Sequence, residues 1–351
     1  AGKRSFAFYE KPGAGKTKIM LDVAVRLWCE GAIDGLLVVS YKDVHEQWIL
    51  DEAPKHISKT IPWIGEALRS DKPLVSDVLK PDGSKLRILA VNYEAYATST
   101  KARKVIEDFY RSGNIACVAD ESHRLMNPES KTAAEMTADQ SAFSHRFVAS
   151  GEPTPRGLEN YYAQMRFLDP AILGVVSYAG FKAMFCRMNQ HRQIVDYHNT
   201  EQLHRLMAPY VHVAAPTIDA EQVFEESRFD LGPAARAAYN SMRDELLVMI
   251  DTGQIVTAQG VLPRLTRLSQ IACGFLPTDD EGGVQEFGTE RVDHTLGLLD
   301  RKDPGKAIIW ARWQRDHAAL EARLGGRSAV YNGLTPPAER REIISRFLDP
   351  K

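Results

Sequence analysis

Short apolar runs alternate with amphipathic stretches through the first 170 residues of the chain. Between the runs, residues 19–30 and 100–111 have apolar positions at helical spacing. The runs are rich in branched residues and end at polar or turn residues, which is typical of buried parallel strands. Four such runs lie at residues 36–39, 88–91, 115–118 and 147–149. This alternation predicts an α/β fold with a parallel sheet, whose ligands bind at the carboxyl ends of the strands.

The pattern becomes helical after residue 170, because residues 234–250 and 261–273 have apolar positions at helical spacing. A polar, glycine-containing stretch at residues 279–283 suggests a boundary. An α/β rhythm then returns, with strands predicted at residues 307–310 and 328–331 and helices at residues 296–299, 317–324 and 339–347. We therefore expect an α/β domain at residues 1–170, a helical region at 171–285 and the start of a second α/β domain at 286–351.

Composition limits the function only loosely. The chain has 351 residues, of which 44% are hydrophobic and 26% charged, enough apolar material for two compact cores. No apolar run approaches the length that crosses a bilayer, so no membrane partner is expected. The four cysteines are far apart and form no C-x-x-C pair, which favours a reducing, intracellular location. The net charge of −2 does not itself indicate nucleic-acid binding, although a local basic channel remains compatible with it.

A glycine-rich loop is the strongest chemical signal. It follows the apolar residues 6–8, precedes a helical segment and reads Gly13-Ala14-Gly15-Lys16-Thr17. A phosphate chain needs close backbone N–H donors, which glycine presents without side-chain clashes. Lys16 would then reach the outer phosphates, and the Thr17 hydroxyl would bind Mg²⁺. The generic motif has glycine or alanine where this chain has Glu10, so an ordinary glycine turn is the alternative.

Two adjacent carboxylates, Asp120 and Glu121, follow the predicted strand at residues 115–119. A nucleotide hydrolase needs one carboxylate to hold Mg²⁺ through water and another to activate the attacking water. Alternation along a strand can divide these roles, and we assign Asp120 to the metal and Glu121 to the water. A helix cap is the alternative for such a pair. Ser150 and Gly151 end the next predicted strand, where a small hydroxyl residue can respond to the state of His123.

The order of these motifs resembles that of SWI/SNF-type DNA-dependent ATPases of helicase superfamily two. Residues 120–131 resemble the family's second helicase motif, and Glu10 lies where the family carries an acidic residue in its nucleotide loop. Further matches are residues 36–40 with Trp48 to motif Ia, 91–94 to motif Ib, 150–153 to motif III and 307–313 to motif IV. Glu152 departs from the small residue of motif III, and the adenine-recognising segment and motifs V and VI have no counterpart in these residues.

The resemblance implies two RecA-like P-loop lobes with parallel sheets and helical insertions, the second lobe being incomplete in this chain. It implies an ATPase that uses ATP and Mg²⁺ and translocates on double-stranded DNA without sequence preference. The family's DNA contacts fall near motifs Ia and Ib, which nominates Lys42, Tyr93, Arg124 and Arg156. Each of these could instead be a solvated surface residue.

Three alternatives stay open: a strand-separating helicase, a restriction-type motor of the same superfamily, and an ATP-dependent binding protein that does not hydrolyse. A compact bacterial or phage version is expected, located in the cytoplasm or nucleoid, or in the host cytoplasm if it is phage-encoded. Because the family's arginine finger lies in motif VI, we expect the 351-residue chain not to hydrolyse ATP efficiently alone.

Overall fold

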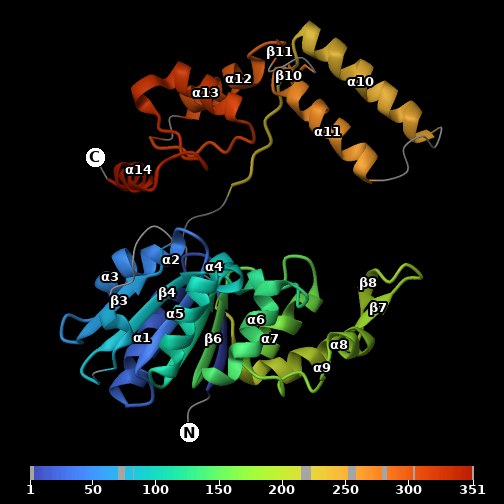
Figure 1. Ribbon diagram of the computed structural model, residues 1–351. Coiled ribbons are helices and arrows are strands. Elements are labelled where there is room, and N and C mark those ends of the chain that lie inside the picture. The colour runs from blue at the N-terminus through green and yellow to red at the C-terminus, as the bar shows by residue number, and fades with distance from the viewer. Residues whose placement is uncertain are drawn as a thin grey trace. The chain divides into compact units, whose positions relative to one another are not determined.

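The structure is a computed structural model that describes residues 4–69, 76–81, 83–214, 223–251, 258–278, 283–302 and 305–349. The chain forms two compact units, Ala1–Glu221 and Gln222–Lys351, and each is described by itself (Figure 1). The division into three regions, at residues 170 and 285, stays a prediction. Most of its boundary stretch, residues 279–282, lies outside the described residues.

A parallel sheet forms the centre of the first unit. Among the described residues it has seven strands in the order β3-β4-β2-β5-β6-β1-β9, and all neighbouring pairs are parallel. The strands are β1 (Ser5–Tyr9), β2 (Gly35–Ser40), β3 (Trp63–Ala67), β4 (Leu86–Asn92), β5 (Ile115–Asp120), β6 (His145–Ser150) and β9 (Val211–His212). The four strands predicted from apolar runs are therefore confirmed as β2, β4, β5 and β6.

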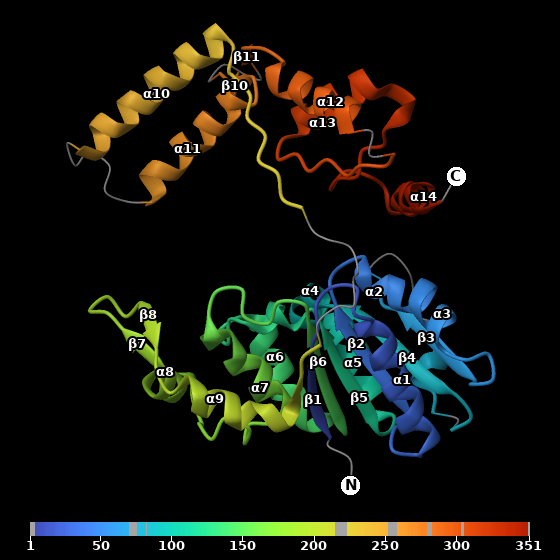
Figure 2. The ribbon, with the colours of Figure 1, turned by 180° about the vertical axis from the view of Figure 1, so that it is seen from behind.

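Helices cover both faces of this sheet (Figures 1 and 2). One face packs against α1 (Lys16–Cys29), α3 (Ala53–His56) and the turn Trp48–Glu52, which follows α2 (Val44–Gln47). The other face packs against α4 (Tyr93–Thr98), α5 (Thr100–Arg111), α6 (Lys131–Asp139), α7 (Tyr161–Leu168), α8 (Tyr178–Phe185) and α9 (Thr200–Met207). The helix predicted at residues 100–111 has the bounds of α5.

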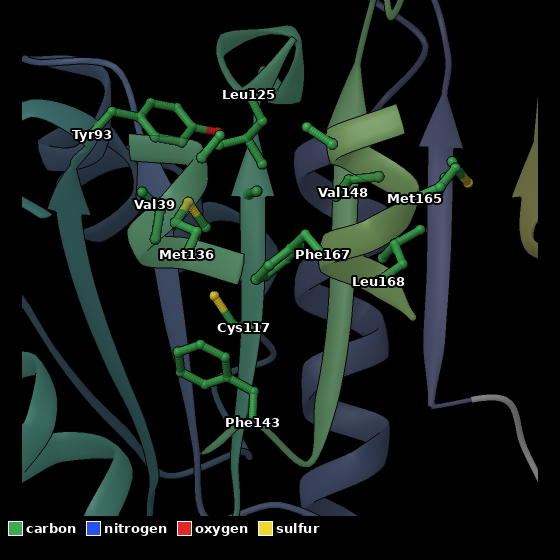
Figure 3. Packing of buried hydrophobic residues seen from close by; sticks show 14 of the residues in the cluster. Val39, Tyr93, Cys117, Leu125, Met136, Phe143, Val148, Met165, Phe167 and Leu168 are labelled. Atoms are coloured by element: carbon green, nitrogen blue, oxygen red, sulfur yellow. The ribbon is translucent and has the colours of Figure 1, made fainter. Parts of the chain in front are cut away.

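Alternate residues of each central strand enter two separate cores. Val39, Cys117 and Val148 face the core that holds Met136 of α6 and Phe167 of α7 (Figure 3). The apolar residues next to them along the same strands face the other core, which lies under α1. Every residue of β2 and β5 is buried, and burial of each large apolar side chain contributes roughly 1.5–3 kcal/mol. This packing fixes the carboxyl ends of the strands, where the candidate site lies.

Two small strand features occur where the apolar pattern predicts helices. The strands β7 (Cys186–Met188) and β8 (Ile194–Tyr197) form an antiparallel hairpin, and β9 adds an edge strand beside β1. Most residues of the hairpin strands are only partly buried or exposed, so they carry no run of core positions that a sequence pattern could detect.

The second unit is mainly helical within its described residues. Its helices are α10 (Pro233–Asp251), α11 (Ala258–Ala272), α12 (Glu290–Lys302), α13 (Gln314–Leu324) and α14 (Pro337–Leu348). A short antiparallel pair joins β10 (Phe275–Pro277) to β11 (Val284–Glu286). All five helices predicted for this part of the chain are present. Across the described residues, no helix combines the length and the apolar character needed to cross a bilayer.

The strands predicted at residues 307–310 and 328–331 are wrong. Both segments lack strand structure, and they line a cavity of about 570 Å³ together with residues of α12, α13 and α14. Ile308 is 66% exposed and Trp310 is 91% exposed. An apolar run becomes a strand only where a neighbouring strand pairs with its backbone N–H and C=O groups. Neither segment joins a sheet among the described residues of this unit.

Candidate functional site

The carboxyl ends of the central strands bring the sequence motifs together at one edge of the sheet. Tyr9 at the end of β1 is in register with Ser150 at the end of β6, and Asp120 at the end of β5 is in register with Ala149. The glycine loop, the carboxylate pair and the Ser150-Gly151 turn therefore lie beside one another. This is the position at which an open parallel sheet binds its ligands.

The glycine loop has the backbone of a phosphate cradle. Gly13 and Gly15 have φ angles of 85° and 84°, a left-handed conformation that favours glycine. Helix α1 begins directly afterwards, without a capping side chain or an acidic residue in its first turn. Its N-terminal N–H groups and positive dipole end are suited to an anion. The Lys16 Nζ donates to the backbone carbonyl of Glu10 at 2.9 Å, so the lysine lies against its own loop.

Asp120 is a buried and tightly oriented carboxylate. Its Oδ2 accepts hydrogen bonds from Trp48 Nε1 at 3.0 Å and from Ser40 Oγ at 3.1 Å, and its Oδ1 accepts one from the Glu121 N–H at 3.0 Å. Burial raises the pKa of Asp120, and the hydrogen bond from Trp48 opposes that effect. These donors hold the carboxylate in one orientation.

Glu121 leaves the strand through a turn with a φ of 51°. This left-handed backbone, which costs a non-glycine residue of order 1–3 kcal/mol, separates Glu121 from Asp120. The prediction that alternation along the strand separates the two side chains is therefore wrong, because β5 ends at Asp120. The hydrogen bond from His123 lowers the pKa of Glu121, and the charge of Lys16 lowers it further against the effect of burial. Glu121 is thus a carboxylate of lowered pKa near Lys16 of the glycine loop.

His123 connects three side chains at this edge. Its Nδ1 lies 3.0 Å from Ser150 Oγ and 3.3 Å from Glu121 Oε2, and its Nε2 lies 2.9 Å from the Tyr41 hydroxyl. The Ser150 hydroxyl is also 3.5 Å from Glu121 Oε2. The structure therefore brings together His123 and Ser150, as the sequence predicts.

Gly151 packs directly against the glycine loop. A Cβ atom at Gly151 would lie 2.9 Å from Cδ of Pro12, closer than real Cβ contacts come. The Gly151 backbone N–H also bonds to Glu121 and lowers its pKa. A movement of the turn after β6 would therefore change the contacts of both Pro12 and Glu121.

Three of the four candidate DNA contacts are exposed at the surface. Lys42, Arg124 and Arg156 lie in the segments that follow β2, β5 and β6, and Arg124 forms an ion pair with Glu94 at 2.8 Å. Tyr93 is fully buried, and its hydroxyl donates to the backbone carbonyl of Asp120 at 2.6 Å. This burial corrects the prediction that Tyr93 contacts DNA: its side chain supports the carboxylate pair from within the core.

Sequence patterns missed two polar side chains of the site. Tyr41 binds His123, and the buried Gln164 of α7 accepts hydrogen bonds from Ser122 Oγ at 2.6 Å and Tyr9 at 3.2 Å. The Gln164 amide also donates to the carbonyl of Pro153 at 2.8 Å. A lone glutamine among apolar residues was the available signal for Gln164, and a hydroxyl residue just past a strand end was the signal for Tyr41.

Known proteins resemble this chain in sequence. The CHD3-type chromatin-remodeling factor PICKLE of Arabidopsis thaliana is 33% identical over 94 residues, 27% of this chain and 6% of that protein. The DNA repair and recombination protein RAD54 of Oryza sativa subsp. japonica is 27% identical over 175 residues, 47% of this chain and 17% of that protein. Each match therefore covers less than a fifth of the relative's length.

A solved structure shares the fold. The Sulfolobus solfataricus SWI2/SNF2 ATPase core, solved in complex with double-stranded DNA, is 19% identical with a TM-score of 0.50, and the match covers 98% of this chain and 71% of that one. The parallel α/β sheet agrees with this match. The family model of the SNF2-related domain matches residues 5–273, well over half of the chain. This protein therefore belongs to the SNF2-related domain family, a helicase-superfamily-two group of SWI/SNF type, as the order of its motifs predicts.

Proposed function

We propose that this chain is part of a motor that hydrolyses ATP and uses the energy to move along double-stranded DNA. The observation that carries the proposal is the position of Glu121, between the Lys16 loop and the His123–Ser150 pair. Family membership supports ATP as the nucleotide, and the archaeal ATPase core was solved with double-stranded DNA.

The glycine loop would bind the phosphates. Backbone N–H groups of residues 13–17 and the N-terminus of α1 would donate to phosphate oxygens, and Lys16 would leave the Glu10 carbonyl to reach the outer phosphates. Asp120 and the Thr17 hydroxyl would hold Mg²⁺, whose preferred ligands are oxygen atoms of this kind. The oriented, buried carboxylate of Asp120 fits that role. When bound, the metal neutralises charge that develops on the phosphates.

Glu121 would act as the general base. Its lowered pKa keeps the carboxylate ionised, so that it can accept a proton from the attacking water. His123 and Ser150 contact Oε2 and would hold the carboxylate toward the γ-phosphate. The Gly151 contact with Pro12 would transmit movements of the loop to the same group.

Exposed basic residues would contact the DNA backbone. Lys42, Arg124 and Arg156 carry the right charge for phosphate oxygens. Phosphate contacts position a duplex without reading its sequence, so binding is expected to be independent of sequence. Such contacts release counterions, and affinity therefore falls as salt rises.

The test is steady-state phosphate release by the complete motor that contains this chain, with and without duplex DNA. Duplexes of unrelated sequence should stimulate hydrolysis, and added salt should weaken the stimulation. Lys42→Ala should raise the DNA concentration needed for half-stimulation, whereas Lys101→Ala, which removes an exposed lysine on α5, should not. Stimulation by RNA alone, or by a single DNA sequence alone, contradicts the proposal. Displacement of a labelled strand would indicate a strand-separating helicase instead.

A further inference from the structure

The hydroxyl of Tyr41 approaches His123 from the side opposite the carboxylate. It lies 2.9 Å from Nε2, while Nδ1 of the same ring faces Glu121 and Ser150. The Tyr41 ring is held in place, because it forms an edge-to-face pair with buried Tyr93 at 6.2 Å between ring centroids, and the Arg124 guanidinium lies 5.9 Å from the centroid of the Tyr41 ring. Tyr41 is therefore a fixed partner of the imidazole.

This geometry distinguishes the two neutral forms of His123. A neutral imidazole carries one N–H, and the hydrogen bond at one nitrogen decides which nitrogen carries it. A carboxylate only accepts hydrogen bonds, so the Nδ1 that faces Glu121 is the nitrogen that donates. Nε2 then accepts, and the Tyr41 O–H is the donor that it faces. Removing that donor leaves Nε2 without the partner that favours this form, while the contacts at Nδ1 remain.

The segment that carries Tyr41 is itself bound to the carboxylate pair. Ser40, immediately before Tyr41, and Trp48, seven residues after it, both donate to Asp120. Between them, Asp43 has a φ of 69°, a strained backbone of the kind found at functional sites. One segment of the chain therefore contacts Asp120 and His123 at the same time.

We propose that Tyr41 is a positioning residue for hydrolysis: its O–H holds His123 in the Nδ1–H form, which in turn orients Glu121. The proposal rests on the function proposed above, since it assigns Glu121 the role of base. Among the described residues, the Tyr41 side chain contacts His123, Tyr93 and Arg124 and not the glycine loop. Its removal should therefore slow the chemical step and leave nucleotide binding unchanged.

The kinetic test compares Tyr41→Phe with the wild-type residue in the complete motor that contains this chain. The loss of one neutral hydrogen bond should lower kcat by roughly three- to tenfold, with the KM for ATP unchanged. Tyr197→Phe is the matched control, because it removes one tyrosine hydroxyl that is bonded to Glu159 instead of His123. In a His123→Ala background, Tyr41→Phe should have no further effect. An equal loss in both backgrounds, or a raised KM with unchanged kcat, overturns the proposal.

A second measurement does not depend on hydrolysis. In protein labelled with ¹⁵N-histidine, NMR reports which ring nitrogen carries the hydrogen, and signals missing in His123→Gln identify His123. The wild-type chain should show the Nδ1–H form, and Tyr41→Phe should shift it toward the Nε2–H form. A spectrum that is unchanged by Tyr41→Phe refutes the positioning role even if the chain proves to be an active ATPase. A shift in a chain that lacks ATPase activity would instead count against the proposed function alone.

Discussion

The two units of this protein carry similar apolar patterns but different structures. In the first unit, residues 36–39 and 115–118 become the fully buried strands β2 and β5, each paired on both sides. In the second, residues 307–310 and 328–331 carry a comparable pattern, yet neither joins a sheet, and Trp310 is 91% exposed. The difference teaches that an apolar run is compatible with a strand, but the run forms one only where a neighbouring strand pairs with it.

The polar groups also differ in part, although the second unit also buries a carboxylate, Asp316, beside Arg291. In the first unit, Asp120 is buried among three donors at the sheet edge. In the second, pairs such as Arg315 with Glu286 and Arg323 with Asp293 lie at the surface, where an ion pair contributes only about 0–1 kcal/mol. Matched substitutions in the two units therefore test whether the hydrolytic chemistry belongs to the first unit.

The largest effect is expected at the proposed base. Glu121→Gln preserves the shape of the side chain and removes the proton acceptor, so phosphate release should fall by roughly two to four orders of magnitude while ATP still binds. The matched change in the second unit, Glu286→Gln, affects only a surface pair and should leave hydrolysis unchanged. Steady-state phosphate release by the complete motor measures both. Turnover of Glu121→Gln at the wild-type rate would place the base elsewhere.

Loss of the loop lysine should come next. Lys16→Ala removes a charge-assisted hydrogen bond to phosphate, worth about 1.5–3 kcal/mol, so ATP affinity should fall by roughly 10- to 150-fold. Lys18→Ala is the control, since Lys18 is exposed and pairs with Asp22 on the surface of α1. Isothermal titration calorimetry with each variant measures the affinity. Equal affinities for ATP would rule out the phosphate-loop assignment.

The two tryptophans Trp48 and Trp310 should respond differently to the same change. Trp48→Phe leaves the buried Asp120 without one of its donors, which should lower the free energy of unfolding by about 1–3 kcal/mol. Trp310→Phe alters an exposed ring and should change the free energy of unfolding by less than about 0.5 kcal/mol. Urea denaturation followed by circular dichroism compares them. Equal midpoints would show that the bond to Asp120 contributes nothing to stability.

The smallest effects, of opposite sign, are expected at two glycines. Gly151→Ala forces Pro12 to move and should cost about 1 kcal/mol or more, with weaker ATP binding. Gly297→Ala meets no atom within 4 Å in the middle of α12 and should stabilise that helix by about 0.5–1 kcal/mol. Thermal unfolding and ATP titration of each variant provide the comparison. Unchanged ATP affinity in Gly151→Ala would mean that the loop absorbs the added methyl group.

Local patterns were sufficient for much of this molecule. The four apolar runs, the helix at residues 100–111 and the glycine loop are short-range features, and the structure contains all of them. The loop and the carboxylate pair also sit at the sheet edge that a parallel fold implies. Hydrophobic periodicity and glycine chemistry act over a few residues, so the chain displays them before it folds.

Tertiary structure decided the contacts that make the site specific. Tyr93 has the sequence position of a surface contact, but packing buries it beneath Asp120. Tyr41 and His123 are 82 residues apart, and they meet only because β2 and β5 are neighbours in the sheet. Strand pairing likewise decided that residues 307–310 are not a strand. Such contacts depend on which distant segments become neighbours in the sheet, and the apolar pattern of one segment does not specify its partner.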